Sequence, residues 1–458
     1  MGHVGRVKCA SEIPDCVQST LRRAGGFAAV GTLALAAPVL KAAAFAPFAA
    51  VALLAAFVVD DGPLFEVFAR PGDHQDGRLN GLAGFALAAA GLAILVAAME
   101  MPVALFVATV LVISYGNLGK QAVAAVSDDP FLGTSGFVVG GFLGGFFGQI
   151  GARLIEETAV PVASLWPSLP LFVFLASSAA VVAALFREML FERDDPLVML
   201  STGLLLWLFG ALAGPVGAVE IVGALALTVA LGYISYALEA ASVAGMLSGV
   251  LFSLLVIVFG GFGWFAVLMA FFAIGALSTK FRYDEKRNRG VAEDNDGARG
   301  TGNVLGNAAV ALVAVVGFAA STRIPVDGTL FQYAFAGSMA AALSDTLSSE
   351  VGGLYDNTRL ITTFERVDPG TDGGVTWQGE LSGLVGAAIV AVVAMLLLSA
   401  VTTPVGGAVV LLGGLAGMTV DSVLGATVEG ARVGNEAVNF TATLVGAVVS
   451  TGVAFLVL

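Results

Sequence analysis

Long apolar stretches alternate with short polar ones along most of the chain. Many of these stretches contain about 17–22 residues with few or no charged side chains, which is enough to cross the hydrocarbon core of a bilayer as an α-helix. Helices are suited to this environment because they satisfy their backbone hydrogen bonds internally. The pattern therefore predicts an all-α, polytopic integral membrane protein.

About fifteen spans can be marked by this length criterion. They lie near residues 25–41, 43–59, 80–98, 102–126, 135–154, 164–186, 197–213, 216–236, 239–258, 260–278, 303–320, 330–348, 380–399, 403–424 and 438–457. Residues 1–24 are predicted to form a polar head on the cytoplasmic side. The apolar stretch that follows Arg23 is long and a second span follows at once, so we interpret it as a first transmembrane helix rather than a signal peptide.

Composition supports this class and removes several functions. Hydrophobic residues make up 58% of the 458 residues and charged residues 12%, against about 25% charged in an average soluble domain. The net charge of −13 and the scarcity of lysine indicate a salt-rich cytoplasm, as in a halophile, and argue against a nucleic acid partner. Cys9 and Cys16 precede the first span, and His3 and His74 are the only histidines, which disfavours a thiolate or histidine metal site in the membrane body.

The distribution of cations predicts the topology. With the N-terminus in the cytoplasm and the spans alternating, only Lys41, Arg153 and Arg323 of the 21 cations fall outside. An excess of Lys and Arg in cytoplasmic loops is the usual bias of membrane proteins. We therefore expect a multi-pass protein of the cell membrane whose N-terminus and polar motif loops face the cytoplasm.

Two membrane halves are predicted, residues 25–197 and 198–458. The first contains SYGNLGKQAV (114–123) and then DPFLGTSGFVVGGFLGG (129–145), and the second contains LSDTLSSEVG (343–352) and then DPGTDGGVTWQGELSGLVGA (368–387). These segments indicate either a distant repeat or a chance likeness between glycine-rich helices. If the repeat is real, Asn117 stands where Asp345 stands, and the N-terminal half is a non-catalytic partner.

Three polar clusters interrupt the apolar pattern near the C-terminus, at 278–307, 342–380 and 417–436. Each combines carboxylates, glycines and amides. Ionisable groups at the edge of the hydrocarbon region are energetically costly and therefore usually functional. If the three clusters meet on one face, they form a site for an anionic, metal-bound ligand at a membrane surface.

Asp345 and Asp421 lie at the rims of apolar spans. Mg²⁺ prefers such hard oxygen ligands and binds through one or two carboxylates together with substrate phosphates. The alternative is a helix cap or a buried polar pair. Glu350 lies five residues after Asp345, so in a continuous helix its side chain faces a different direction.

The segment PGTDGG (369–374) can expose successive backbone N–H groups of the kind that hold phosphate, although such a segment is also an ordinary turn. The cations of the first cluster can neutralise a polyphosphate, or they can reflect only the usual excess of Lys and Arg in cytoplasmic loops. Two asparagines, four residues apart, share one helix face. The predicted nucleotide- and phosphate-binding residues are Gly370, Thr371, Asp372, Gly373, Gly374, Asn303, Asn307, Lys286 and Arg287. Phosphoryl transfer tolerates the absence of a nucleophile–base pair, because its catalysis is mostly positioning and charge neutralisation.

Five segments of residues 200–458 together resemble a known membrane family that includes the plant phytyl-phosphate kinase and is related to CTP-dependent polyprenol kinases. They are LSTKFRYDEKRNRGV, GTGNVLGN, GSMAAALSDTLSSEVG, RLITTFERVDPGTDGGVTWQGELSG and VDSVLGATVEG. The resemblance implies a membrane enzyme that uses CTP and Mg²⁺ to convert a prenyl monophosphate, such as phytyl or geranylgeranyl phosphate, to the diphosphate.

The same resemblance implies metal-binding and phosphate-binding roles for Asp345, Glu350, Asp421, Lys280 and residues 370–374. We predict that Asp345, Glu350, Asp421 and Lys280 are catalytic and that the metal ligands are Asp345 and Asp421. Leu347 stands where the family motif leads us to expect a tryptophan, which leaves the acceptor preference open.

Two other functions remain open on sequence grounds. A cytidylyltransferase would use the same parts to make a CDP-lipid. A transporter would carry intramembrane carboxylates at broken helices in two repeated halves.

Overall fold

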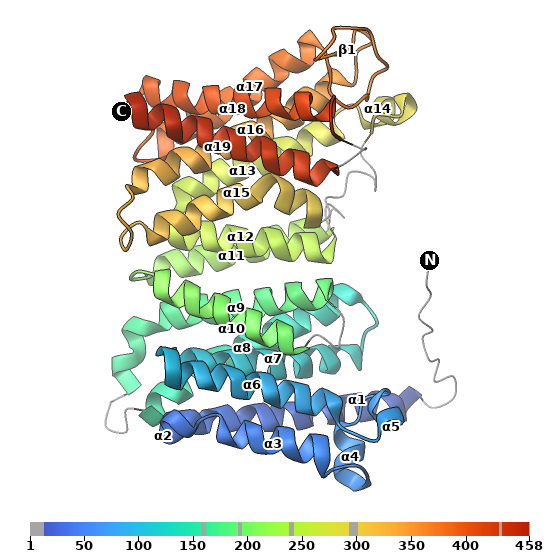
Figure 1. Ribbon diagram of the computed structural model, residues 1–458, viewed down its shortest axis with the longest axis vertical. Coiled ribbons are helices and arrows are strands. Elements are labelled where there is room, and N and C mark those ends of the chain that lie inside the picture. Colours follow the sequence, from blue (N-terminus) through green and yellow to red (C-terminus); the bar gives the residue numbers. More distant parts are fainter. Residues whose placement is uncertain are drawn as a thin grey trace. The chain divides into compact units, whose positions relative to one another are not determined.

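The structure is a computed structural model that describes residues 13–156, 162–190, 195–237, 242–292, 301–429 and 433–457. Nearly all of these residues are helical (Figure 1), which confirms the all-α prediction. Residues 1–12 of the predicted polar head, 293–300 of the first polar cluster and 430–432 of the third lie outside the described residues, and residues 13–24 begin the first helix.

Twelve helices within the described residues are long and apolar enough to cross a membrane, or thirteen if one bent pair counts as a single span. That pair is α3 (Ala46–Phe57) and α4 (Gly62–Phe68), bent by 107°. The remaining predicted spans are helices α15 and α16. The apolar part of α15, Gly306–Ala320, is short, and polar side chains lower the hydropathy of α16. The prediction of a polytopic membrane protein with about fifteen transmembrane helices is thereby confirmed approximately.

Contacts divide the chain into two compact units, unit 1 up to Ala211 and unit 2 from Ala218 to Leu458, with residues 212–217 shared between them. The sequence-based division at 197/198 falls inside helix α10, whereas the units divide at the end of that helix. The elements of unit 1 are α1 (Ile13–Thr32), η1 (Leu33–Ala36), α2 (Ala37–Leu40), η2 (Lys41–Ala43), α3, α4, α5 (Asp73–Asp76), α6 (Asn80–Met99), α7 (Val103–Ala124), α8 (Pro130–Glu156), η3 (Val162–Ser168), α9 (Leu169–Met189) and α10 (Asp195–Leu212).

Unit 2 is a bundle in which successive long helices run in opposite directions. Its elements are α11 (Ala218–Ala237), α12 (Val243–Gly260), α13 (Phe262–Lys280), α14 (Tyr283–Arg289), α15 (Thr301–Ala320), α16 (Gly328–Gly352), β1 (Arg359–Leu360), β2 (Gly374–Val375), α17 (Trp377–Leu397), α18 (Pro404–Gly425) and α19 (Asn435–Val457). Glycines allow several of these helices to approach closely. For example, a β-carbon added to Gly386 of α17 would lie 2.8 Å from the carbonyl oxygen of Leu343 in α16.

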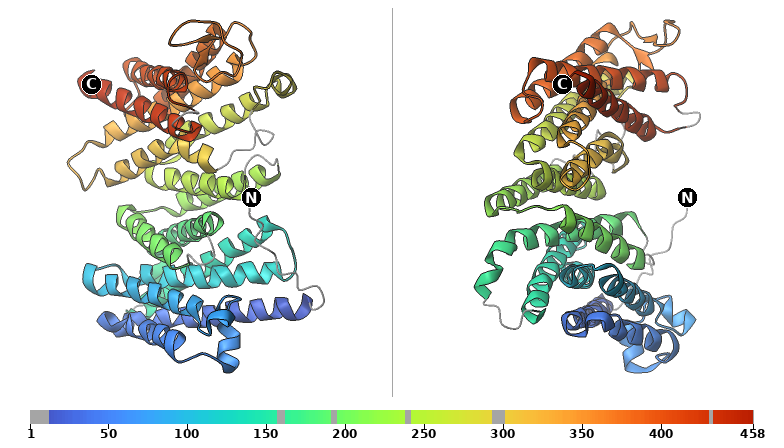
Figure 2. Two further views of the ribbon diagram at one scale, coloured as in Figure 1. Left: turned by 45° about the vertical axis from the view of Figure 1, so that its right-hand side comes forward. Right: turned by 60° about the vertical axis from the view of Figure 1, so that its left-hand side comes forward.

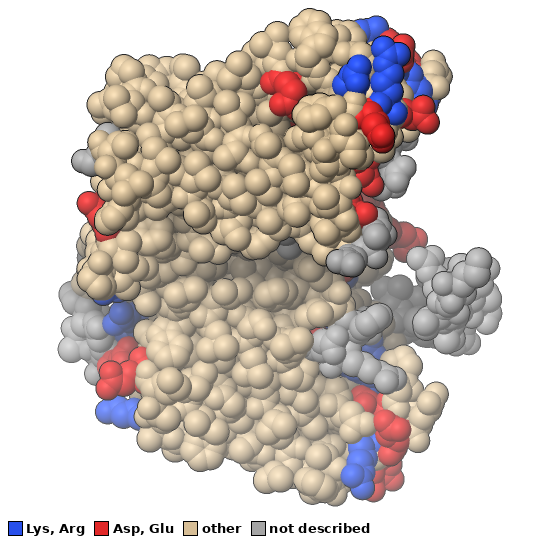
Figure 3. All heavy atoms as spheres, turned by 45° about the horizontal axis from the view of Figure 1, so that its top comes forward, with Lys and Arg blue, Asp and Glu red and all other residues tan. Residues whose placement is uncertain are grey.

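The polar elements of unit 2 gather at one end of its helices. The antiparallel strands β1 and β2 close a hairpin there, and α14 lies at the same end (Figures 1 and 2). In Figure 3, charged side chains concentrate at the ends of the helices and leave the flanks largely free. Exposed apolar side chains such as Leu396 and Val392 cover those flanks, as expected of a surface that faces lipid.

Candidate functional site

A polar cavity of about 620 Å³ lies at the end of unit 2 that carries the hairpin. Helices α16 and α18 end at the cavity, and α17 and α19 begin there. The lining residues are Gly290, Val291, Ala292, Asn307, Asp345, Thr346, Ser348, Ser349, Glu350, Gly352, Gly353, Thr358, Gly370, Thr371, Asp372, Gly373, Gly374, Thr376, Asp421, Ser422, Glu429, Asn435 and Asn439. All three polar clusters of the sequence thus contribute to one cavity.

Asp345 and Asp421 face each other across the packed helices α16 and α18. The close approach depends on small residues, since a β-carbon on Gly414 would lie 2.9 Å from that of Ala340. The two acidic side chains lie close together in the cavity lining. One oxygen of Asp421, Oδ1, is buried without a hydrogen-bond partner. Two carboxylates this close attract a proton or a cation, because like charges in a poorly solvated site repel.

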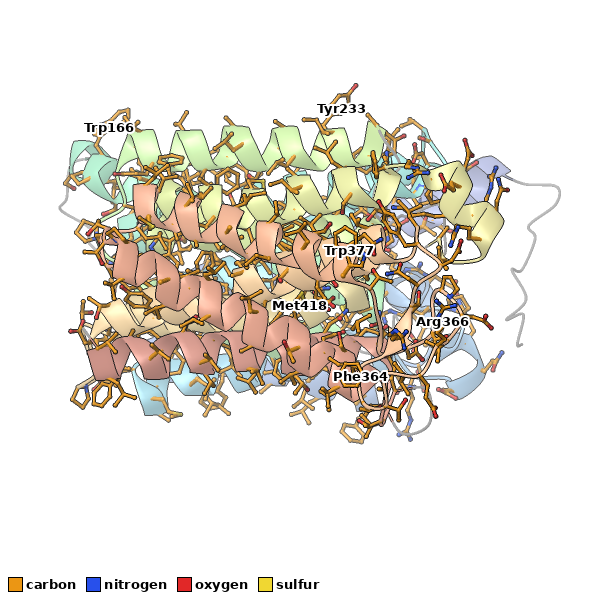
Figure 4. The ribbon with its side chains drawn as sticks, turned by 90° about the horizontal axis from the view of Figure 1, so that it is seen from above. Trp166, Tyr233, Phe364, Arg366, Trp377 and Met418 are labelled. Atoms are coloured by element: carbon orange, nitrogen blue, oxygen red, sulfur yellow. The ribbon has the colours of Figure 1, made fainter. Side chains whose placement is uncertain are left out.

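The floor of this arrangement is apolar. Met418 lies three residues before Asp421 in α18, and in Figure 4 it is deeper along the helices than Arg366 of the hairpin. The hydroxyl of Ser344 donates to the Gly383 carbonyl at 2.8 Å, and its oxygen lies 3.1 Å from the Met418 sulfur. The carboxylate pair therefore sits where the polar end of the bundle meets its packed interior.

The donor set of the cavity is suited to a magnesium ion shared with a ligand rather than to a closed metal site. Among the described residues, no group of three or more His, Cys, Asp or Glu side chains is placed to hold a metal. Two carboxylates with an unpartnered buried oxygen leave the remaining coordination positions to phosphate and water, which is how Mg²⁺ usually binds.

The predicted glycine loop forms one wall of the cavity. Gly370 and Gly373 have positive φ angles of 82° and 71°. A β-carbon on Gly373 would collide with Ala426 and would lie 2.5 Å from the carbonyl oxygen of Ser422. Glycine at this position thus allows the loop to pack closely against the end of α18. This packing places the exposed Asp372 at the cavity.

Glu429 is a lining residue that was not among the predicted site residues. Burial raises the pKa of its carboxyl group, and the nearby carboxylates of Asp372 and Asp421 raise it further. Its signal in the sequence was membership of the polar cluster 417–436. Asn435, in the same cluster, and Asn439, just after it, were also missed, although they lie four residues apart at the start of α19 and both line the cavity.

Lys286 and Glu350 form a buried ion pair beside the cavity. The Lys286 ammonium donates to Glu350 Oε2 at 2.5 Å and to the carbonyls of Ser278 and Thr279 at 2.7 and 3.0 Å. Both side chains are nearly inaccessible, at 2% and 7% exposure. This lysine therefore connects the short helix α14 to the ends of α13 and α16. Of the two residues of the ion pair, Glu350 lines the cavity and Lys286 does not.

The other predicted cations lie away from the lining. Lys280 is exposed at the end of α13, and Arg287 is exposed and pairs with Asp284 at 3.2 Å. Asn307 lines the cavity, whereas the side chain of Asn303 lies outside the described residues. The lining residues include no lysine or arginine, so the charge of the described cavity is negative.

Comparison with known proteins finds relatives for the part of the chain that forms this cavity. The family model described as integral membrane protein DUF92 matches residues 226–447, which lie within unit 2. An uncharacterized membrane protein of Methanocaldococcus jannaschii is 34% identical over 211 residues, covering 45% of this chain and 82% of that protein.

Two further relatives come from photosynthetic organisms. The chloroplastic protein VTE6 of Arabidopsis thaliana is 33% identical over 201 residues, which cover 42% of this chain and 58% of that protein. An uncharacterized membrane protein of Synechocystis is 32% identical over 212 residues, covering 43% of this chain and 77% of that protein. No solved structure matches the chain.

Proposed function

The chain belongs to the integral membrane protein family DUF92, and on this premise we propose that it is a CTP-dependent kinase that converts a prenyl monophosphate to the diphosphate. The acceptor is phytyl or geranylgeranyl phosphate, and the reaction takes place at the cytoplasmic face of the cell membrane. The motifs of unit 2, which resemble those of the family that includes the plant phytyl-phosphate kinase, support this assignment.

One observation carries the proposal. Asp345, Asp421 and the loop 370–374 are far apart along the chain, yet all of them line one polar cavity at the end of apolar helices. A lipid phosphate needs this geometry, because its head group must reach polar ligands while its apolar tail stays alongside the helices. The neighbouring flanks expose apolar side chains such as Leu384 and Val385 of α17.

Each part of the cavity has a role in this reaction. Asp345 and Asp421 would hold Mg²⁺, which when bound neutralises charge on the phosphates being transferred. The hydroxyls of Thr346, Ser348 and Ser349 line the cavity beside the acidic pair and can donate hydrogen bonds to phosphate oxygens. No strong base is required, because an acceptor phosphate monoester is already ionised and transfer depends mainly on positioning.

The second candidate is a cytidylyltransferase that forms a CDP-lipid with the same cavity. Incubation of the purified chain with geranylgeranyl phosphate and CTP labelled separately in the α- and γ-phosphates tests both. The kinase places the γ-label in the lipid and releases CDP. A CDP-lipid that carries the α-label, with release of pyrophosphate, would replace our proposal by the cytidylyltransferase. A transporter is less well supported, because the polar lining lies at one end of the helices rather than near their middle.

Replacement of Asp345 by Asn should lower phosphoryl transfer at least about a hundredfold, since a preorganised charge at the reacting phosphates is lost. Asp421→Asn should behave alike. The matched control is Asp327→Asn at the opposite end of α16, 18 residues and about 27 Å away along the helix. Asp327 caps that helix by accepting from the Thr329 N–H, and Asn caps equally well. Membrane insertion of all variants is checked by fractionation, and wild-type turnover by Asp345→Asn would overturn the site.

A further inference from the structure

The two units share a packing register that their sequences show only faintly. In unit 1, a β-carbon on Gly140 of α8 would lie 2.5 Å from the carbonyl oxygen of Tyr115 in α7. In unit 2, the equivalent distance from Gly386 of α17 to the carbonyl oxygen of Leu343 in α16 is 2.8 Å. The helix pair α7–α8 therefore packs as α16–α17 does, with Tyr115 in the position of Leu343.

The third helices of the two units extend this register. Gly141, the neighbour of Gly140, would place a β-carbon 3.4 Å from that of Ala180 in α9. In unit 2, a β-carbon added to Gly414 of α18 would lie 2.7 Å from the β-carbon of Ala387, the neighbour of Gly386. Ala180 thus occupies the position of Gly414, and α9 corresponds to α18.

The fourth helices do not extend the register. A β-carbon on Gly446 of α19 would lie 2.6 Å from the carbonyl oxygen of Gly337 in α16, whereas one on Gly203 of α10 would lie nearest to Leu92 of α6, at 2.9 Å. Helix α19 packs closely on α16 and α18, and α10 makes no comparably close contact with α7 or α9. The shared register therefore joins α7–α9 to α16–α18.

Continued to the ends of the helices, this register places Asn117 at the position of Asp345 and Arg187 at that of Asp421. The side chains meet in both units. Arg187 donates from Nη1 to Asn117 Oδ1 at 3.1 Å, and Asp421 and Asp345 lie close together in the cavity lining. None of the glycine contacts involves these four residues, so their pairing is an independent confirmation of the register.

The chemistry at the equivalent positions is opposite in charge. The Arg187 guanidinium also forms an ion pair with Asp195, which pairs in turn with Arg70 at 2.5 Å. The side chains of Arg187 and Asp195 are 15% and 8% exposed. In unit 1 the acidic group Asp195 therefore already has its cations, Arg187 and Arg70.

The glycine loop of unit 2 has no equivalent at this place. The register aligns Gly133 with Gly379, and residues 133–136 lie inside α8. This register does not align GTSG (133–136) with GTDG (370–373), whereas it does align Asn117 with Asp345.

We infer that α7–α9 are a second copy of the site-bearing helices α16–α18, in which the Arg187 guanidinium stands where α16–α18 take a divalent cation. This inference rests on the proposed function, because it takes Asp345 and Asp421 as cation ligands. A covalently attached cation supplies the positive charge permanently, so unit 1 binds no metal or nucleotide at this position. Of these two copies of three helices in the described part of the chain, the copy in unit 2 then carries the cation site.

Thermal unfolding of the purified full chain with and without Mn²⁺, a stand-in for Mg²⁺ at oxygen ligands, tests the inference. Asp345→Asn with Asp421→Asn should abolish the Mn²⁺-dependent rise in unfolding temperature, because a cation stabilises only a fold that binds it. Adding Asn117→Asp and Arg187→Asp should restore a rise of at least about 3 °C. Arg187→Lys in the same double-variant background is the matched control, because it keeps the internal cation and should restore nothing.

The outcomes distinguish a failure of this inference from a failure of the proposed metal site on which it rests. Loss of the shift in the double variant and its return in the quadruple variant support the inference. A shift that persists in the double variant and disappears on further substitution of Asp195 would show a metal in unit 1 and overturn it, and this arm needs no disruptive change at Arg187. Absence of any Mn²⁺ effect in the wild-type chain would overturn the proposed metal site itself.

Discussion

At the scale of single residues, the cavity of unit 2 gathers more acid than base. Asp345, Asp421, Asp372 and Glu429 line it, while the one buried lysine beside it, Lys286, is held by Glu350 and two carbonyl groups. A buried charge pair is costly to break, since loss of one partner leaves the other unpaired in a poorly solvated place. The lysine therefore serves the local structure, and the acidic lining is the part of the cavity that we propose binds a cation.

Glu429 should make the stability of the cation-free chain depend on pH. Its pKa is raised in the fold, so between the ordinary carboxyl pKa and the raised one the folded chain binds more protons than the unfolded chain. Stability must then fall as pH rises through this window. Unfolding temperatures measured in chelator across this range should show the decline in the wild-type chain and a weaker decline in Glu429→Gln.

The Asp372→Asn variant tests the cause of that shift. Removing one of the nearby carboxylates should lower the pKa of Glu429 and move the decline toward lower pH. A profile identical to that of the wild-type chain would show that Asp372 does not act on Glu429.

At the scale of elements, the decisive contact is that of the hairpin loop with the end of α18. Gly373 combines a left-handed backbone with close approach to Ser422 and Ala426. Since the loop carries Asp372 and the end of α18 carries Asp421, this packing joins two parts of the cavity that are 49 residues apart in the sequence. The glycines of this motif are thus explained by packing, independently of any role in binding phosphate.

Gly373→Ala should therefore displace the loop and lower transfer activity at least about tenfold, with a loss of stability of more than about 1 kcal/mol. Gly77→Ala is the matched control, because Gly77 also has a positive φ, 62°, but no atom lies within 4 Å of an added β-carbon. The control should show the backbone cost alone and keep full activity. Comparable activity of the two variants would show that the loop contact does not position the site.

At the scale of the whole molecule, the orientation of unit 2 in the membrane decides which side its site faces, because the cavity opens at the end of the helices that carries the hairpin. The distribution of cations predicts that this end is cytoplasmic. That orientation matters for the proposed reaction, since nucleoside triphosphates are available in the cytoplasm.

Single cysteines introduced into a chain with Cys9 and Cys16 replaced by Ser test the orientation. Thr363→Cys in the hairpin should be protected from a membrane-impermeant maleimide in intact cells and labelled in inside-out vesicles. Thr322→Cys at the opposite end of α15 should show the reverse. Labelling of the hairpin position in intact cells would place the cavity outside and contradict the proposed use of cytoplasmic nucleotide.

The sequence by itself determined the class of the protein, because a bilayer imposes its length and polarity on every span. It also identified Asp345, Asp421 and residues 370–374, since polar groups are conspicuous against an apolar background. The tertiary structure alone decided which groups meet. Lys286 turned inward to Glu350, Gly373 packed on α18, and Arg187 took the position of Asp421 in the other unit. Such pairings depend on the register between helices, which the spacing within one helix does not encode.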